Sequence, residues 1–284
     1  MGNRIVGLVI NYRDAARTAR CVQSLLDNDV SDIFVLDNSA DGGKSAVQLG
    51  DALAGDRRIQ LEVSRENLGF ARGVNRGLRR CVECFDPDVI LIINNDAVLQ
   101  PGALSVLSAA ALKHHESWVI SMDIDHSGRR QGPLFYQRWS GLQFTRPVAG
   151  AFPFASGCCL WVDARKMTFP LLDEAFFMYG EDCELGWRLR QQPGSWTHVA
   201  ESLVRHEGAA SSGVGTLFYE THMVAAHLLL ARKLAHSGIE AAVFSLARIP
   251  VLLARASLRS FRYRSWRPWR ALWLGTQLAW RHAV

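Results

Sequence analysis

The chain has 284 residues, 49% of them apolar, enough to bury the core of one large domain or one domain with an appendage. It contains no run of about 18 uncharged apolar residues, which argues against an ordinary transmembrane helix. The apolar stretch at residues 5–10 is too short for a signal peptide. The six cysteines lack the paired spacing of a structural zinc site. We therefore predict a cytoplasmic protein with reduced cysteines.

The formal net charge of +5 is unevenly distributed along the chain. No Asp or Glu follows Glu240, and the basic residues after it are Arg248, Arg255, Arg259, Arg262, Arg264, Arg267, Arg270 and Arg281. Four tryptophans, Trp266, Trp269, Trp273 and Trp280, alternate with these arginines. This mixture favours an anionic membrane surface, bound peripherally from the cytoplasmic side. A helical cap packed on the rest of the chain is the alternative, and nothing else in the chain resembles a nucleic-acid reader.

Apolar runs separated by amphipathic segments predict alternating strands and helices. The expected strands are residues 5–10, 33–36, 59–63, 89–93 and 118–122. Asp14 is expected to cap the first helix, and Pro101 to open the helix before the fifth strand. We expect a further helix from about Glu181, and helices in residues 216–284 with breaks at Pro250 and Pro268.

This alternation predicts an α/β fold with a mainly parallel sheet flanked by helices. We assign residues 1–215 to this domain and residues 216–284 to a helical, Arg- and Trp-rich extension.

Polar residues follow four of the predicted strands at the point where each strand ends. They are Asn11 and Tyr12, Asp37 and Asn38, Asn67, and Asn94, Asn95 and Asp96. Ligands of parallel sheets bind at the carboxyl ends of the strands, so we expect these clusters to converge on one edge. Asp96 suits a Mg²⁺ or Mn²⁺ ion on a diphosphate, since phosphates and waters supply its other ligands. A turn with local hydrogen bonds is the alternative at Asp96 and at Asp37.

Three further features carry weaker signals. Gly69 would let the backbone approach a ligand closely, and Arg72 could pair with a phosphate. The adjacent acids Glu181 and Asp182 begin a helix, where acids commonly compensate the helix dipole. Their side chains should point about 100° apart, so we expect only one to face a cleft. His206 is either a satisfied histidine or a metal ligand.

Taken together, these residues resemble family 2 glycosyltransferases of the Rossmann-like GT-A fold, and in particular the bacterial rhamnosyltransferases of surface polysaccharide assembly. The motifs that carry the resemblance are Val9-Ile10-Asn11-Tyr12, Asp37-Asn38-Ser39, Asn67-Leu68-Gly69-Phe70-Ala71 with Asn75, Asn94-Asn95-Asp96-Ala97, Ala155-Ser156-Gly157, Phe176-Phe177-Met178-Tyr179-Gly180-Glu181-Asp182, and His206 with Ser211. Each motif is weak alone, but their order along the chain matches the family.

The resemblance implies a role for each matching position. Asp96 would hold the metal and the diphosphate, with Asn94 in place of the family's first acid, and His206 would be a second metal ligand. Asp182 would be the general base, and Glu181 would orient loops or acceptor hydroxyls. The implied nucleotide-sugar contacts are Asn11, Tyr12, Asp37, Asn67, Gly69, Arg72, Asn75, Asn95 and Asp96, and the implied acceptor side is Gly157 with Trp161.

The implied reaction is inverting, metal-dependent transfer of a sugar from a nucleotide-diphosphate donor to a hydroxyl of a glycan or lipid-linked glycan. L-Rhamnose from dTDP-rhamnose is our first choice. A sugar-nucleotide nucleotidyltransferase is one alternative, but it would carry a Gly-rich basic loop where residues 11–14 lie. A catalytically inactive sugar-nucleotide-binding module is the other, and it should have lost Asp96 or Asp182, both of which are present.

Overall fold

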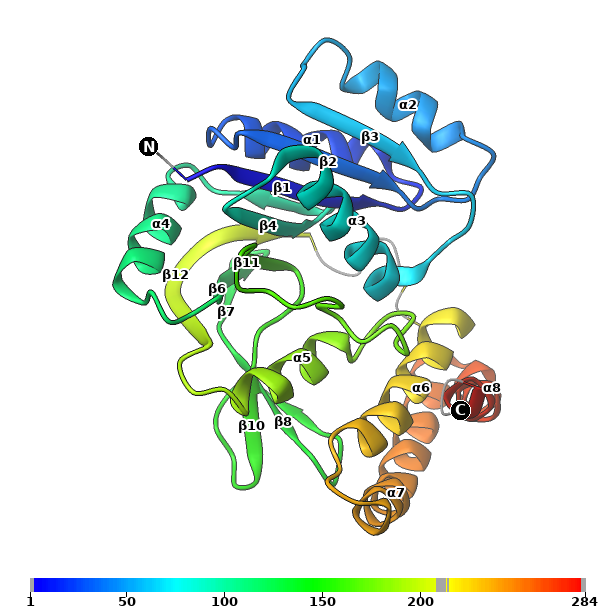
Figure 1. Ribbon diagram of the computed structural model, residues 1–284. Coiled ribbons are helices and arrows are strands. Elements are labelled where there is room, and N and C mark those ends of the chain that lie inside the picture. Colours follow the sequence, from blue (N-terminus) through cyan, green and yellow to red (C-terminus); the bar gives the residue numbers. More distant parts are fainter. Residues whose placement is uncertain (1–2, 208–212, 214, 282–284) are drawn as a thin grey trace.

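The computed structural model describes residues 3–207, 213 and 215–281, and its central feature is one large twisted sheet (Figure 1). The strand order is β3-β2-β1-β4-β11-β6-β12-β5, with β7 paired to β6. The strands are β1 (Ile5–Asn11), β2 (Asp32–Asp37), β3 (Ile59–Val63), β4 (Val89–Asn94), β5 (Ala97–Leu99), β6 (Val119–His126), β7 (Arg129–Gln131), β11 (Cys159–Asp163) and β12 (Trp196–His206).

The first half of this sheet has the predicted parallel arrangement. β1 pairs in parallel with β2 and β4, and β2 pairs in parallel with β3. In the second half β11 runs antiparallel between β4 and β6, whereas β12 is parallel to β6. The result is a mixed, mostly parallel α/β sheet, as predicted from the alternation of strands and helices.

Helices cover both faces of the sheet and create two apolar cores. On one face pack α1 (Ala15–Leu26), α2 (Lys44–Ala52) and α4 (Ala103–Lys113), and on the other pack α3 (Gly69–Phe85) and α5 (Glu181–Arg190). Asp14 caps α1 as predicted, because its side chain accepts a hydrogen bond from the Arg17 backbone N–H. Pro101 lies just before α4, whose N-cap is Gly102, so the predicted helix begins two residues later.

A second, smaller sheet lies below the main one in Figure 1. It is formed by β8 (Leu134–Gln137), β9 (Gln143–Phe144) and β10 (Ala151–Phe154) in the order β10-β8-β9. A third apolar core joins this sheet and α5 to the C-terminal helices α6 (Leu217–Lys233) and α8 (Arg267–Arg281). The division at 215/216 coincides with the start of α6 and stays a prediction, since the helices share this core with the rest of the chain.

The predicted break at Pro250 is wrong. Pro250 lies inside α7 (Gly238–Tyr263), which is continuous over 26 residues. Pro250 is exposed, so water can bond the carbonyl that its missing N–H leaves free. The break near Pro268 is confirmed, since α8 begins at Arg267. By length and composition α7 could cross a membrane, although Arg248 and Arg255 interrupt its apolar sequence and it therefore contains no long uncharged run.

Candidate active site

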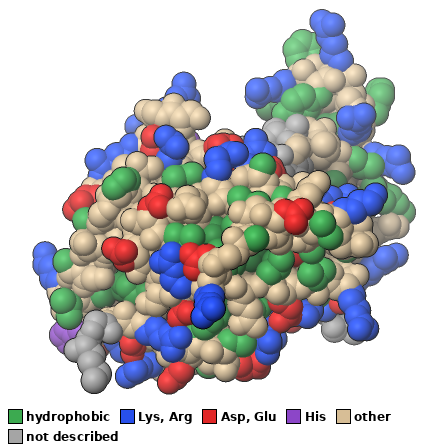
Figure 2. Space-filling view, turned by 90° about the horizontal axis from the view of Figure 1, so that it is seen from above, with side chains coloured by type: hydrophobic (Ala, Val, Ile, Leu, Met, Phe, Trp, Pro, Cys, Tyr) green, Lys and Arg blue, Asp and Glu red, His purple; other side chains and the backbone are tan. Residues whose placement is uncertain are grey.

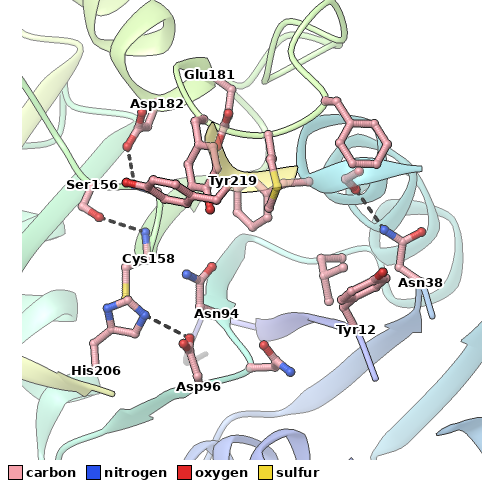
Figure 3. Close-up of a pocket in the computed structure, with 18 of the residues that line it drawn as sticks. Tyr12, Asn38, Asn94, Asp96, Ser156, Cys158, Glu181, Asp182, His206 and Tyr219 are labelled. Atoms are coloured by element: carbon pink, nitrogen blue, oxygen red, sulfur yellow. Dashed lines mark hydrogen bonds and ion pairs between the residues drawn. The ribbon is translucent and has the colours of Figure 1, made fainter. Parts of the chain in front are cut away.

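The strand ends of the main sheet open onto a cavity of about 530 Å³. Tyr12, Asn38, Asn67, Asn95 and Asp96 all line it, which confirms that the polar clusters converge on one edge. The opposite wall comes from the start of α5 and the start of α6. In Figure 3, Glu181 and Asp182 lie on one side of this pocket and Asp96 and His206 on another, with Tyr12 and Asn38 beyond them.

Asn38 fixes the part of the pocket nearest β2. Its amide group donates to the Asn67 side chain (3.2 Å) and to the Gly69 carbonyl (2.9 Å), and it accepts from the Leu68 backbone N–H (2.8 Å). Gly69 has a φ of +74°, and a Cβ there would lie 2.3 Å from the Phe177 carbonyl oxygen. Because Gly69 has no side chain, the backbone of Phe177 can lie directly against it. Gly69 itself also lines the pocket.

Sheet pairing brings Asp96 and His206 together. β12 runs antiparallel to β5 with His206 opposite Ala97, so the His206 imidazole reaches the Asp96 carboxylate at 2.9 Å. Burial alone would raise the pKa of Asp96, but the hydrogen bond and charge of His206 hold it below its ordinary value. The carboxylate is therefore kept ionised although it is buried.

The Asp96–His206 arrangement fits a divalent ion. A carboxylate oxygen of Asp96 and an imidazole nitrogen of His206 lie 2.9 Å apart and both residues line the pocket, so two possible metal donors face the same space. Within the described residues no cluster of three or more His, Cys, Asp or Glu side chains is set to hold a metal. An ion at Asp96 would thus take most of its ligands from phosphates and water, as expected for Mg²⁺ or Mn²⁺ on a diphosphate.

Glu181 and Asp182 form a buried acidic pair at the start of α5. Burial and the neighbouring Asp182 raise the pKa of Glu181 to about 8. Burial also raises the pKa of Asp182, against the backbone N–H groups of Cys183 (2.8 Å) and Gly157 (3.3 Å) that donate to it. Because Asp182 has these donors and Glu181 Oε2 has no hydrogen-bond partner, the shared proton belongs on Glu181 and the charge on Asp182.

Both members of this pair line the pocket, so the expectation that only one would face it is wrong. The helix begins at Glu181 itself, after Gly180 in the left-handed conformation. In the first turn of a helix no preceding turn covers the side chains, so two adjacent side chains can both reach the same opening. The pocket therefore presents one carboxylate and one carboxylic acid side by side.

Comparison with known proteins decides the family. The profile of Glycosyl transferase family 2 matches residues 8–165, more than half of the chain. This chain belongs to glycosyltransferase family 2. Over 300 residues it is 26% identical to the N-acetylglucosaminyl-diphospho-decaprenol L-rhamnosyltransferase of Mycobacterium tuberculosis, covering 90% of this chain and 95% of that protein.

Solved structures agree on the GT-A fold. Residues 1–349 of S. aureus TarS match with a TM-score of 0.55 at 13% identity, over 92% of this chain and 72% of that one. The mannosyltransferase PcManGT from Pyrobaculum calidifontis, in complex with GDP-Man and Mn²⁺, matches with a TM-score of 0.51 at 15% identity, over 98% and 87% of the two chains. The predicted family and fold are both confirmed.

Five residues that the motifs assigned to ligand contacts of this glycosyltransferase lie outside the pocket lining. Asn75 is fully buried and uses its amide on the Leu172 backbone, donating to the carbonyl (2.8 Å) and accepting from the N–H (3.1 Å). Arg72 is exposed and pairs with Glu66 at 3.5 Å. Trp161 is a core residue of β11 and does not line the pocket, so the structure does not place it on the acceptor side.

Asn11 and Asp37 form a layer beneath the pocket. The Asn11 amide donates to Asp37 Oδ1 (2.8 Å) and accepts from the Thr18 hydroxyl (2.7 Å). Asp37 Oδ2 is buried without a hydrogen-bond partner. This pair fixes the ends of β1 and β2, and the nucleoside contact assigned to Asp37 stays a prediction. Ser211 lies outside the described residues.

The sequence motifs missed an aromatic wall. Phe177 and Tyr179 precede α5, and Phe218 and Tyr219 begin α6; all four line the pocket. Tyr179 and Tyr219 pack edge to face with ring centroids 5.3 Å apart, and Phe177 and Phe218 at 6.0 Å. The first two residues stood in a motif that was interpreted only for its acids. Gly157, which was assigned to the acceptor side, also lines the cavity.

Proposed function

We propose that this glycosyltransferase moves a sugar from a nucleotide-diphosphate donor to an acceptor hydroxyl with inversion at the anomeric carbon. The observation that carries the proposal is one pocket with Asp96 and His206 on one side and the acidic pair Glu181–Asp182 on another. The first group suits a diphosphate with its metal, and the second suits a hydroxyl that must lose a proton.

Asp182 is the proposed general base. The acceptor oxygen attacks the anomeric carbon and passes its proton to the Asp182 carboxylate, while the bond to the nucleotide diphosphate breaks and that group leaves with the electron pair. Burial raises the pKa of Asp182, which makes it a stronger base than an exposed aspartate. Neutral Glu181 beside it can orient the acceptor by donating a hydrogen bond.

Asp96 and His206 are the proposed protein ligands of a divalent ion, Mg²⁺ or Mn²⁺. Such an ion neutralises charge on the leaving diphosphate when it is bound. Tyr12, Asn38 and Asn67 line the part of the pocket beyond these residues, toward the ends of β1 and β2, and we assign the nucleoside to this region. The Mn²⁺ and GDP-Man in the PcManGT complex support a metal and a nucleotide sugar of this kind.

For the donor we propose dTDP-L-rhamnose, and for the acceptor a lipid-linked glycan in polysaccharide or glycolipid assembly at the cytoplasmic face of the membrane. The support is the M. tuberculosis relative, which is an L-rhamnosyltransferase whose name specifies N-acetylglucosaminyl-diphospho-decaprenol. The aromatic wall adds support, because aromatic faces pack well against the apolar faces of sugar rings.

A direct assay tests the proposal. The full chain is incubated with Mg²⁺ or Mn²⁺, a polyprenyl-diphospho-N-acetylglucosamine acceptor, and either dTDP-rhamnose or a panel of UDP-sugars. We expect acceptor-dependent release of dTDP and a product heavier by one rhamnosyl group. Preference for a UDP-sugar would reject rhamnose, and release of diphosphate from a sugar phosphate and a nucleoside triphosphate would favour the nucleotidyltransferase alternative. No turnover with any donor, together with sugar-nucleotide binding, would favour the inactive module.

A further inference from the structure

α7 presents an unusually apolar face to solvent. The bulky exposed side chains of this helix are Ile239, Val243, Leu246, Ile249, Leu253, Leu258 and Phe261. Most of them are three, four or seven residues apart, which places them along one side of a helix. Leu246 is 65% exposed and Phe261 is 87% exposed. We call this set the α7 apolar face; at 1.5 Å per residue it extends over about 33 Å.

The arginines of α7 within this span lie on its other side and hold it to the protein. Arg248 is buried and donates to the backbone carbonyls of His227 and Arg138. Arg255 and Arg259 both pair with the buried carboxylate of Glu220 in α6, at 3.1 Å and 2.5 Å. α7 is thus fixed with its polar side inward and its apolar side outward.

This anchoring decides between lying on a membrane and crossing one. The helix is long enough to cross, but crossing would pull three arginines away from their partners and into lipid. Each arginine near the middle of a bilayer costs several kcal/mol, at least about 2.5. A helix with one charge-free side and one anchored side is suited to lie parallel to the interface.

Positive charge gathers where α7 ends and α8 begins. Arg262, Arg264, Arg267 and Arg270 are exposed there, and Trp266 beside them is 80% exposed. In Figure 2, a projection on the side where the C-terminal helices lie carries Lys, Arg and hydrophobic side chains without Asp or Glu. No acidic residue follows Glu240 anywhere in the chain, so nothing in this segment neutralises these arginines.

We propose that the α7 apolar face inserts into the interfacial region of an anionic phospholipid membrane, just below the headgroups. The arginines at the α7–α8 junction pair with lipid phosphates. Charge complementarity selects this occupant. A second copy of the chain on the same face would bring two arginine clusters into one assembly, where they repel, whereas anionic headgroups neutralise them. The exposed Trp266 suits the boundary between headgroups and acyl chains.

Docking in this way would place the pocket near the lipid. α6 connects the two regions, because Phe218 and Tyr219 line the pocket and the next residue, Glu220, holds Arg255 and Arg259 of α7. Only this consequence rests on the proposed function, since a lipid-linked acceptor would then meet the pocket from its own membrane. The docking itself depends on the surface and needs no catalytic activity.

Vesicle flotation with the full chain tests the proposal. We expect binding to vesicles of phosphatidylcholine and phosphatidylglycerol at low salt, and little binding to phosphatidylcholine alone. Leu246→Gln/Leu253→Gln should reduce the vesicle-bound fraction about tenfold, because both side chains lose their apolar insertion. Val47→Gln/Leu112→Gln is the matched control, since these residues lie on α2 and α4 and are at least as exposed as the α7 pair, and it should bind like the wild type.

Two further measurements separate the outcomes. Circular dichroism and thermal unfolding of both double variants should match the wild type, because the substituted side chains are exposed; Leu246→Gln and Leu253→Gln as single variants repeat the test if the double variant unfolds. Sedimentation shows whether the chain self-associates in solution. Absence of binding to anionic vesicles, equal loss in the control variant, or a dimer that only the α7 variant dissociates would each overturn the proposal, whether or not the protein transfers a sugar.

Discussion

Asp96 and Asp182 are buried aspartates in the same pocket, yet their surroundings shift their pKa values in opposite directions. Burial raises the pKa of Asp182, whereas at Asp96 burial is outweighed by the hydrogen bond and charge of His206 acting together with smaller contributions, so its pKa is lowered. The hydrogen bond to His206 helps keep Asp96 ionised and suited to bind a metal. Burial outweighs the backbone N–H donors beside Asp182 and makes it readier to accept a proton. Both acids are buried, so the imidazole beside Asp96, which has no counterpart among the described residues around Asp182, accounts for the opposite shifts.

The largest effect should come from removing proton acceptance at Asp182. Asp182→Asn keeps the shape, and its amide oxygen can still accept from the Cys183 backbone N–H, but the amide cannot take the acceptor proton. We expect the rate of transfer to fall about 10²–10⁴-fold with donor affinity retained. Turnover and donor binding measured on the same preparation check this. Turnover within about threefold of the wild type would make Glu181 the first candidate for the base.

The second-largest loss of turnover should come from replacing Asp96, on the other side of the pocket. Asp96→Asn removes the charge that attracts the metal, and we expect turnover to fall about 10²–10³-fold, together with a loss of metal-dependent donor binding. Calorimetric titration of the donor with and without Mn²⁺ separates this variant from Asp182→Asn, which should keep the metal effect. Full wild-type activity in excess chelator would contradict the metal assignment.

The contrast between the two acids also marks what the sequence could predict. Strand-end clusters converge because parallel pairing brings carboxyl ends to one edge, so the positions of Tyr12, Asn67 and Asp96 followed from periodicity and order. The Asp96–His206 contact depends on the antiparallel return of β12 beside β5. Only the family resemblance indicated it, because these residues are 110 positions apart.

The assigned residues that do not line the pocket have a common physical explanation. A motif gives the identity of a residue but not the direction of its side chain. Asn75 turns into the protein to satisfy the Leu172 backbone, and Trp161 packs into the core between the buried residues Leu160 and Val162. Tyr219 could not be found, since α6 reaches the pocket only through tertiary packing and its first turn carries no recognisable pattern.

A smaller effect should come from replacing His206, the hydrogen-bond partner of Asp96. Its loss should reduce the difference in pKa between Asp96 and Asp182. His206→Gln keeps a polar side chain but loses the imidazole ligand and the charge that lowers the pKa of Asp96. We expect metal affinity to fall about 10–100-fold, the usual effect of replacing a residue that supports a metal site. Turnover should then be largely recovered at high Mn²⁺. A Mn²⁺ titration of activity tests this. A rate loss that no metal concentration restores would assign His206 a role other than holding metal.

The smallest effect on rate should come from Glu181→Gln. The pKa of Glu181 is raised to about 8, so near neutral pH it is protonated, and glutamine mimics that neutral form. We therefore expect turnover at pH 7 within about threefold of the wild type, in contrast to Asp182→Asn.

The pH dependence of stability should distinguish Glu181→Gln from the wild type more clearly than the rate does. A carboxyl whose folded pKa is raised binds its proton more tightly in the folded state, so its contribution to stability is full below the unfolded pKa of about 4.3 and is lost as pH rises to about 8. Glutamine has no proton to lose. The variant should therefore gain stability relative to the wild type as pH rises from 5 to 9, by on the order of 1 kcal/mol or more, which corresponds to about 2–4 °C in Tm. Thermal unfolding of both proteins across this pH range measures the difference. Parallel curves would mean that Glu181 is already ionised in the folded protein at neutral pH, and it could then not be the neutral hydrogen-bond donor beside Asp182.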